Sequence, residues 1–261
     1  MGDTGARSMI DPISDETIRR YREQGFVHVP GVLDADEVAR YAEAAAQLLD
    51  SHMEIWDGVN GVEVNYVAQA WRKSDTIREL ALHPAIGSIA LQLADGPMRL
   101  YTSEVLAKEP HKAAPTLVHD DETGLPLSSL SRALTAWVAL SDVPVERGCL
   151  SYVPRSHLRP PEHRQEHMTS FEEFADITDI WPEFPWQPRV TVPLRAGDVT
   201  FHHCRTVHLA GSNTSDARRM GHGIVYVNAD ATYRPGVQDG HMAGFEPGQP
   251  LDDEGFPLIT L

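Results

Sequence analysis

A histidine followed by three acidic residues occupies the segment LVHDDETG, residues 117–124. In an extended chain residues i and i+2 point to the same face. This alternation selects Asp121 as the companion of His119 and turns Asp120 outward, toward solvent. Two ligands from one short segment plus a distant histidine are typical of a site that holds Fe(II) and leaves coordination positions open. The segment therefore indicates a metal site, and the alternative is a surface or core histidine beside acidic loop residues.

Candidates for the third ligand lie in AGDVTFHHCRTVHLAGSNTSDARRMG, residues 196–221. His202 and His203 are adjacent, so at most one of them faces the site, and either can instead be a packed or hydrogen-bonded strand histidine. His208 differs from both because a cation, Arg219, follows it eleven residues later on the next predicted strand. His208 therefore stands out among the candidates for the third ligand, and the choice between the three histidines stays open on spacing alone.

The charge of the chain limits its partners. Its 261 residues carry a formal net charge of -16 at pH 7. An acidic protein gains no counterion release on a phosphate backbone and no attraction to an anionic membrane face. We expect no nucleic acid and no membrane as a partner, and we expect a small-molecule substrate.

Targeting signals and cysteines indicate the compartment. There is no run of about 18 apolar residues, and the N-terminal MGDTGARSMIDPIS lacks the apolar stretch of a secretory signal. We therefore expect a cytoplasmic protein. Cys149 and Cys204 do not form a C-x-x-C pair, and we expect buried free thiols.

The pattern of secondary structure changes at about residue 98. Helical periodicity and capping residues predict helices within residues 13–25, 33–50 and 74–96, the last broken at His83-Pro84. From residue 98 the chain is rich in short segments of β-branched and aromatic residues separated by turn residues. Helices followed by many short strands favour a sandwich or barrel with a helical flank over alternating β/α units.

Several motifs together resemble one known family. VHDD, LTAWVALSDVPVERGCLSYVPRSH, GDVTFHHCRTVHLAGSNTSDARR and REQGFVHVPGVLDADEV are similar to the phytanoyl-CoA dioxygenase family of Fe(II)- and 2-oxoglutarate-dependent oxygenases. The resemblance runs, with gaps, from about Ile13 to Asn228. It implies a double-stranded β-helix, a cupin-like jelly roll, with flanking helices, and Fe(II), 2-oxoglutarate and O2 as cofactor and cosubstrates.

The resemblance also assigns residues to roles. It implies His119, Asp121 and His208 as iron ligands, and Arg219 as the residue that binds the remote carboxylate of 2-oxoglutarate through its fork of donors. Arg218, one residue away, is expected to be a surface charge. Two weaker matches, Lys108 and Thr102, are expected at the 2-oxoglutarate site, with a solvated loop charge and an ordinary strand threonine as alternatives. Trp137 matches a family tryptophan, for which packing is an alternative role.

The expected organisation is one domain over residues 1–261. It comprises a flexible tail (1–12), a helical flank (13–97), the jelly-roll core (98–230) and a C-terminal extension (231–261). The aromatic-rich segment from about 158 to 188 is predicted to form a lid through Trp181, Phe184 and Trp186, with packing of these aromatics as the alternative. Glu122 begins a loop that is expected, with Trp137, to meet the substrate.

The expected reaction is hydroxylation of an unactivated C–H bond in a small metabolite or natural-product intermediate, with release of succinate and CO2. Desaturation, ring closure and epoxidation use the same ligands and remain alternatives, whereas Asp121 disfavours halogenation because related halogenases have a small residue there. An acyl-CoA substrate is a family possibility, although no basic cluster for its phosphates is visible. More remote alternatives are a metal-binding jelly roll without 2-oxoglutarate chemistry and a non-catalytic relative.

Overall fold

A computed structural model describes residues 12–58, 62–112, 115–160, 184–185, 188–235, 242–252 and 254–260. Its helices are α1 (Asp15–Gln24), α2 (Ala35–His52), α3 (Ala70–Lys73), α4 (Asp75–Ala81), α5 (Pro84–Ala94) and the 3-10 turns η1 (Glu122–Gly124), η2 (Val145–Arg147) and η3 (Ser156–Leu158). Its strands are β1 (Phe26–Val29), β2 (Glu54–Gly58), β3 (Val62–Val67), β4 (Met98–Lys108), β5 (Thr116–His119), β6 (Leu127–Ser128), β7 (Leu134–Ala139), β8 (Leu150–Tyr152), β9 (Val190–Val192), β10 (Val199–His203), β11 (His208–Ala210), β12 (Arg219–Asn228) and β13 (Thr232–Tyr233).

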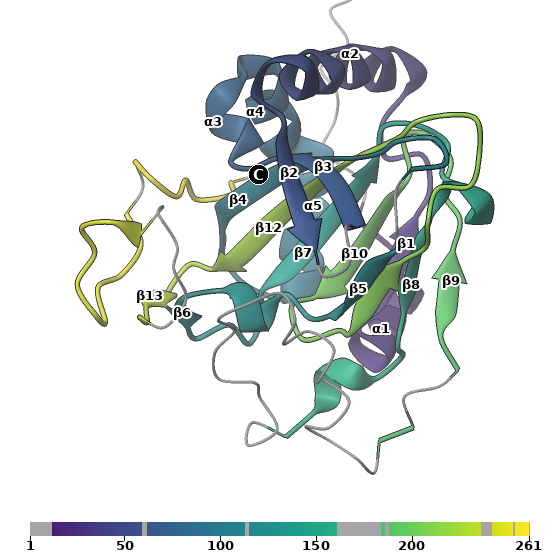
Figure 1. The fold of residues 1–261 in the computed structure, drawn as a ribbon. Helices are drawn as coiled ribbons and strands as arrows, with labels where there is room; N and C mark the ends of the chain where they lie inside the picture. Colours follow the sequence, from purple (N-terminus) through teal and green to yellow (C-terminus); the bar gives the residue numbers. More distant parts are fainter. Residues whose placement is uncertain are drawn as a thin grey trace, which may run out of the picture.

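Two antiparallel sheets form the body of the protein (Figure 1). The larger sheet has the order β1-β10-β7-β12-β4-β3-β2, and the smaller has the order β5-β11-β8-β9. Strands that are distant in the chain are neighbours in both sheets, as the Greek-key connections of a jelly roll require. The structure confirms the predicted jelly roll with a helical region near its N-terminus.

The helices α1, α2, α4 and α5 begin and end close to where the sequence predicts, whereas the short α3 lies outside the predicted helices. Ser14 caps α1 by accepting a hydrogen bond from the Thr17 amide, and Gly25 ends it with a φ of 86°. Asp34 and Glu37 form a capping box on α2. Pro84 occupies the first turn of α5, where its missing N–H costs nothing.

Alternation along β4 separates two buried regions. Ser103, Val105 and Ala107 are buried, and the two apolar ones join the core that packs α2, α4 and α5 on the larger sheet. The residues between them point to the opposite face, where Leu106 joins a second cluster with Leu150 of β8 in the smaller sheet. The space between the two sheets is therefore lined by alternate residues of the central strands.

The region between residues 54 and 67 departs from the predicted helical flank. β2 and β3 form a hairpin that extends the larger sheet through β4, and β1 adds its other edge. Residues 13–97 therefore contribute three strands as well as helices. The sequence did not indicate this hairpin, because its pairing with β4 depends on a strand more than thirty residues further along.

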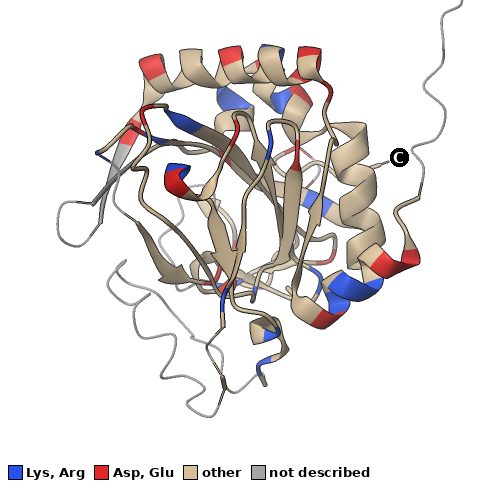
Figure 2. Ribbon diagram, turned by 90° about the vertical axis from the view of Figure 1, so that its right-hand side faces the viewer, with Lys and Arg blue, Asp and Glu red and all other residues tan. Residues whose placement is uncertain are grey.

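Acidic residues recur along α2, which lies at the top of Figure 2.

Among the helices in the described part of the chain, none has both the length and the apolar character needed to cross a bilayer.

Candidate metal centre

The smaller sheet brings two histidines together through its register. His119 ends β5, His208 begins β11, and the two residues are paired directly across the strands. Their ring centroids lie 4.2 Å apart. Asp121 follows two residues after His119, and one ligand atom from each of the three residues lies within 4.8 Å of the others. The three side chains predicted as ligands therefore converge. We call this group of side chains, His119, Asp121 and His208, the metal cluster.

Backbone carbonyls set the orientation of both histidine rings. His119 Nδ1 lies 2.7 Å from the Leu117 carbonyl oxygen, and His208 Nδ1 lies 2.9 Å from that of Thr206. Because a carbonyl oxygen only accepts, each Nδ1 carries the hydrogen, and each Nε2 keeps its lone pair for a metal ion. Burial lowers the pKa of His208, and burial together with His208 lowers the pKa of His119 to about 4. Both rings are therefore neutral near pH 7, the state that binds metal.

The outer oxygen of Asp121 is held by two side chains of the larger sheet. Thr135 Oγ1 donates to Asp121 Oδ2 at 2.6 Å, and His202 Nε2 lies 3.0 Å from the same oxygen. Enclosure in protein would by itself raise the pKa of Asp121, but His208 and His202 outweigh this and hold the pKa below its ordinary value. Asp121 is therefore a carboxylate anion beside two neutral imidazoles.

This donor set fits the iron that the fold family implies. Two imidazole nitrogens and one carboxylate oxygen converge, and His119 and Asp121 stay partly exposed while His208 is buried. Such a facial arrangement binds divalent iron and leaves coordination positions for other molecules.

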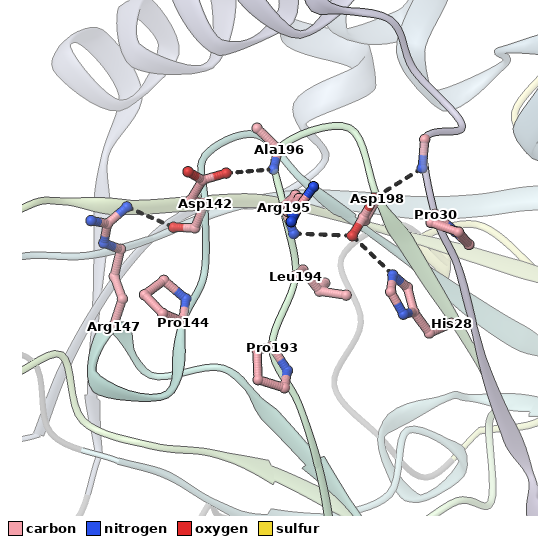
Figure 3. A pocket seen from close by; sticks show the side chains of 11 residues that line it. His28, Pro30, Asp142, Pro144, Arg147, Pro193, Leu194, Arg195, Ala196 and Asp198 are labelled. Atoms are coloured by element: carbon pink, nitrogen blue, oxygen red, sulfur yellow. Dashed lines mark hydrogen bonds and ion pairs between the residues drawn. The ribbon is translucent and has the colours of Figure 1, made fainter.

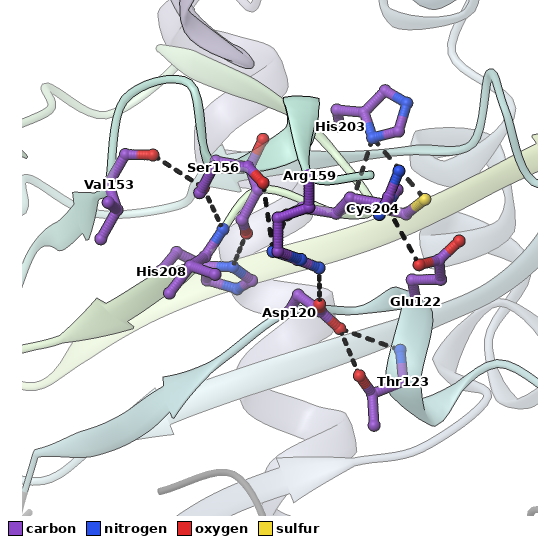
Figure 4. A network of polar contacts seen from close by, with 12 residues as sticks. Asp120, Glu122, Thr123, Val153, Ser156, Arg159, His203, Cys204 and His208 are labelled. Carbon is purple, nitrogen blue, oxygen red and sulfur yellow. Dashed lines mark hydrogen bonds and ion pairs between the residues drawn. The ribbon is translucent and has the colours of Figure 1, made fainter. Parts of the chain in front are cut away.

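Asp120 corrects one part of the prediction. It turns away from the metal cluster, but toward the interior rather than toward solvent, and it is 1% exposed. Its carboxylate forms an ion pair with the buried Arg159 and accepts hydrogen bonds from the amide and hydroxyl of Thr123 (Figure 4). The chain leaves the extended conformation after His119, and Asp121 has α-helical dihedral angles. Strand alternation therefore does not govern this turn.

Glu122 follows Asp121 in the same turn. Its buried carboxylate forms an ion pair with Arg205, with Oε2 and Nε 3.2 Å apart. The amides of Asp121 and Glu122 both donate to the Cys204 carbonyl oxygen at 2.9 Å. These contacts anchor the turn that carries Asp121, and a contact between Glu122 and the substrate stays a prediction.

Arg219 and Lys108 face each other across β12 and β4. Arg219 donates from Nη1 to the Gly148 carbonyl oxygen at 2.7 Å, whereas its Nε has no hydrogen-bond partner among the described residues. Lys108 Nζ donates to the Gly211 carbonyl oxygen at 2.7 Å. Burial lowers the pKa of Arg219 to about 10, and burial together with Arg219 lowers that of Lys108 to about 6. A buried guanidinium with an unpaired donor fits the carboxylate of an acidic cosubstrate.

Three further residues singled out in the sequence lie near Arg219 or elsewhere on the larger sheet. Arg218 pairs with Glu109 at 2.7 Å, and its side chain is 40% exposed, as a surface charge should be. Thr102 accepts a hydrogen bond from Gln69 at 3.0 Å. Trp137 is buried, and the Arg219 guanidinium lies 5.0 Å from its ring centroid.

The predicted lid lies largely outside the described residues, including Trp181 and Trp186. Phe184 is described, and it packs with Val153 and Val207. Val207 directly precedes His208, so this small apolar group lies next to the start of β11.

Sequence reasoning missed Thr135 and left His202 open between packing and ligation. The structure shows both at the outer oxygen of Asp121. Alternation along the predicted strands could have shown which face of the sheet each side chain points to. It could not have shown that both side chains meet Asp121, which lies in a turn after a strand of the other sheet.

An open depression of ≈ 840 Å³ lies apart from this chemistry, beside His28 of β1 (Figure 3). Asp198 there pairs with His28 at 2.9 Å and accepts from the amides of Gly31 and Arg195. None of the metal-cluster side chains lines this depression. Its polar groups hold turns together, and we assign it no part in the chemistry.

Fold and site together define the class of jelly-roll proteins with a two-histidine, one-carboxylate metal cluster. The family model Phytanoyl-CoA dioxygenase (PhyH) matches residues 21–221, and the chain belongs to this family. The resemblance predicted from the motifs is therefore confirmed.

Among curated relatives, phytanoyl-CoA dioxygenase domain-containing protein 1 of Mus musculus is 27% identical over 177 residues. The match covers 66% of this chain and 60% of that protein, so it spans less than two thirds of the relative's length.

Solved structures give longer matches. The non-heme alpha ketoglutarate dependent carbocyclase SnoK from nogalamycin biosynthesis is 60% identical, with a TM-score of 0.91, and the match covers 98% of this chain and all of that one (100%). The epimerase SnoN in complex with Fe3+, alpha ketoglutarate and nogalamycin RO is 47% identical, with a TM-score of 0.82, and the match covers 94% of this chain and 98% of that one.

Proposed function

We propose that this protein is an Fe(II)- and 2-oxoglutarate-dependent enzyme that oxidises a C–H bond of a small natural-product intermediate. The observation that carries the proposal is the convergence of His119, Asp121 and His208 in a sheet sandwich that also buries Arg219. The similarity to SnoK and SnoN over almost the whole chain supports the same chemistry and substrate class.

Each part of the site has a defined task in this proposal. Iron and 2-oxoglutarate bound there would supply the oxidant that removes hydrogen from carbon, with O2 consumed and succinate and CO2 released. His119 and His208 present neutral Nε2 atoms, and Asp121 supplies the negative charge. Arg219, with Lys108 beside it, would bind the remote carboxylate of 2-oxoglutarate.

Ring closure is the product type that we favour over the hydroxylation expected from the sequence. The specific reason is the 60% identity to a carbocyclase, with both chains covered almost completely. Ring closure removes two hydrogen atoms from the substrate, and these leave with one oxygen atom of O2 as water while the other enters succinate. Hydroxylation and epimerisation remain candidates because they would use the same metal ligands.

The cosubstrate assignment is tested by anaerobic titration of the Fe(II)-loaded protein with 2-oxoglutarate, followed by calorimetry and by the visible band of the complex. We expect Arg219→Lys to weaken 2-oxoglutarate binding by about 10- to 100-fold, since a charged hydrogen bond is worth about 1.5–3 kcal/mol. Arg218→Lys is the matched control and should bind as the wild type does. Absence of 2-oxoglutarate binding by the wild type would overturn the proposed function.

The product type is tested by mass spectrometry of turnover mixtures that contain a panel of natural-product intermediates, including those of nogalamycin biosynthesis. Ring closure gives a product that lacks two hydrogen atoms, hydroxylation adds one oxygen atom, and epimerisation leaves the mass unchanged. Formation of succinate in step with product ties each outcome to the same site.

A further inference from the structure

Asp121 can donate only one of its oxygens to a metal ion in this structure. A carboxylate oxygen has two lone pairs in the plane of the group. Both lone pairs of Oδ2 are engaged, by Thr135 Oγ1 at 2.6 Å and by His202 Nε2 at 3.0 Å. Oδ1 is the other oxygen, and it lies 3.7 Å from His208 Nε2.

The two donors are placed by the register of the larger sheet. Thr135 of β7 and His202 of β10 are directly paired across the strands, so their side chains emerge side by side on the same face. Thr135 and His202 are both buried. The metal ligands, in contrast, come from the smaller sheet and the turn after β5.

His202 is suited to donate rather than to ligate. His202 Nε2 lies 3.0 Å from the acceptor oxygen Asp121 Oδ2 and is therefore the ring nitrogen that carries the hydrogen, and Nδ1 has no hydrogen-bond partner among the described residues. The ring is held between neighbours, with its centroid 5.3 Å from that of Tyr152 and 4.4 Å from that of His208. The cluster of converging ligand atoms contains His119, Asp121 and His208 but not His202.

We propose that Thr135 and His202 form a two-donor clamp on Asp121 Oδ2, the Asp121 clamp, which restricts Asp121 to one-oxygen coordination through Oδ1. A two-oxygen carboxylate would occupy a coordination position that a cosubstrate needs. The Asp121 clamp keeps that position open and ties the metal cluster to the sheet that carries Arg219. This inference rests on the proposed metal site and deepens it, because it makes His202 and Thr135 positioning residues.

Cobalt(II) is the probe for the test, since its visible absorption reports coordination number. Metal-free wild type and variants are titrated with Co(II), and the dissociation constant and the absorption band are recorded. We expect Thr135→Val and His202→Leu each to weaken Co(II) binding by about 10- to 100-fold, the usual effect of losing a hydrogen bond to a metal ligand. The double variant Thr135→Val with His202→Leu should also show the absorption of a site with a higher coordination number, because both oxygens of Asp121 are then free to bind the metal ion.

Conservative variants separate positioning from packing. Thr135→Ser keeps the hydroxyl, and His202→Gln keeps an N–H at a similar reach, so both should bind Co(II) close to the wild-type value. His203→Gln is the matched control, because His203 lies next in β10 and contacts the Ser131 carbonyl oxygen instead. Its Co(II) affinity should not change. Thermal unfolding with a chelator identifies any variant that merely loses stability.

The outcomes distinguish the clamp from the metal site itself. If wild type binds Co(II) and both Thr135→Val and His202→Leu bind it equally tightly with an unchanged spectrum, the Asp121 clamp is refuted. If wild type binds no Co(II), the proposed function fails with it. If His202→Leu does not fold, Thr135→Val decides, because valine has nearly the shape of threonine and lacks only the donor.

Discussion

Two neighbouring aspartates show how differently residues of one type can be used. Asp121 lies in the metal cluster, with its Oδ2 bound by Thr135 and His202. Asp120 is buried on the other side of the turn, where it neutralises Arg159 and accepts two hydrogen bonds from Thr123. Asp121 belongs to the three side chains that could hold a metal ion, and Asp120 stabilises the turn that carries Asp121.

Substitution should separate these two roles. We expect Asp121→Ala to abolish metal-dependent turnover and tight Co(II) binding while the protein remains folded, because the lost charge served the metal. We expect Asp120→Ala to lower the free energy of unfolding by about 3–5 kcal/mol, because it leaves the Arg159 charge buried without its partner. Urea unfolding and metal titration of both variants measure the two effects.

A double variant checks the cause of the instability. Asp120→Leu with Arg159→Met replaces the buried pair by apolar side chains, which is often close to neutral. It should therefore be more stable than Asp120→Leu alone. Equal unfolding free energies of the Asp120→Ala variant and the wild type would contradict the assigned role of this ion pair.

At the scale of elements, β12 links the cosubstrate site to the core. Arg219, Gly221 and Gly223 alternate along one face of this strand and lie opposite β4 and β7. The Trp137 ring covers Gly221 so closely that a Cβ atom there would overlap it, and the Arg219 guanidinium packs on the same ring. Gly221 is therefore the position at which β12 accommodates Trp137.

We expect Gly221→Ala to lower the free energy of unfolding by about 1–3 kcal/mol, the usual cost of overpacking. It should also weaken 2-oxoglutarate binding, because a displaced Trp137 no longer supports Arg219. Gly223→Ala is the matched control on the same face, where the nearest side-chain atom to a new Cβ lies 3.7 Å away. Its stability should equal or slightly exceed that of the wild type. Thermal unfolding and calorimetry measure both effects, and equal behaviour of the two variants would contradict the argument.

At the scale of the whole molecule, the buried histidines make folding sensitive to acid. His222 lies between Val105 and Val138 in the larger sheet, is fully buried, and has no hydrogen-bond partner for either ring nitrogen among the described residues. Burial lowers its pKa from the ordinary 6.5 to about 3. Burial also lowers the pKa of His203, to about 4.

The sign of the resulting pH dependence follows from proton binding. Between pH 6.5 and about 3 the unfolded chain binds a proton at His222 that the folded protein does not, so stability falls as the pH falls. We expect His222→Leu to reduce this slope by up to about 1.4 kcal/mol per pH unit. Urea unfolding of the metal-free protein over that range measures the slope. A wild-type slope in the His222→Leu variant would contradict the assignment of this acid sensitivity to His222.

The sequence by itself determined what depends on local pattern. Helix caps at Ser14 and Asp34 and the short segments of β-branched residues after residue 98 predicted helices followed by a sandwich or barrel, because short-range sterics and periodicity specify such elements. The motif order around His119 and His208 carried the family resemblance, and the resemblance implied the jelly roll.

Only the tertiary structure decided which distant side chains meet. The addition of β2 and β3 to the larger sheet, the burial of Asp120 against Arg159 and the two donors on Asp121 Oδ2 all depend on contacts between separate elements. The type of a residue and the strand face on which it lies do not specify which side chain of the other sheet it will contact. Strand register and the turn after His119 decide which of these side chains meet. The contacts of Asp120 and Asp121 are strong because their charges are buried.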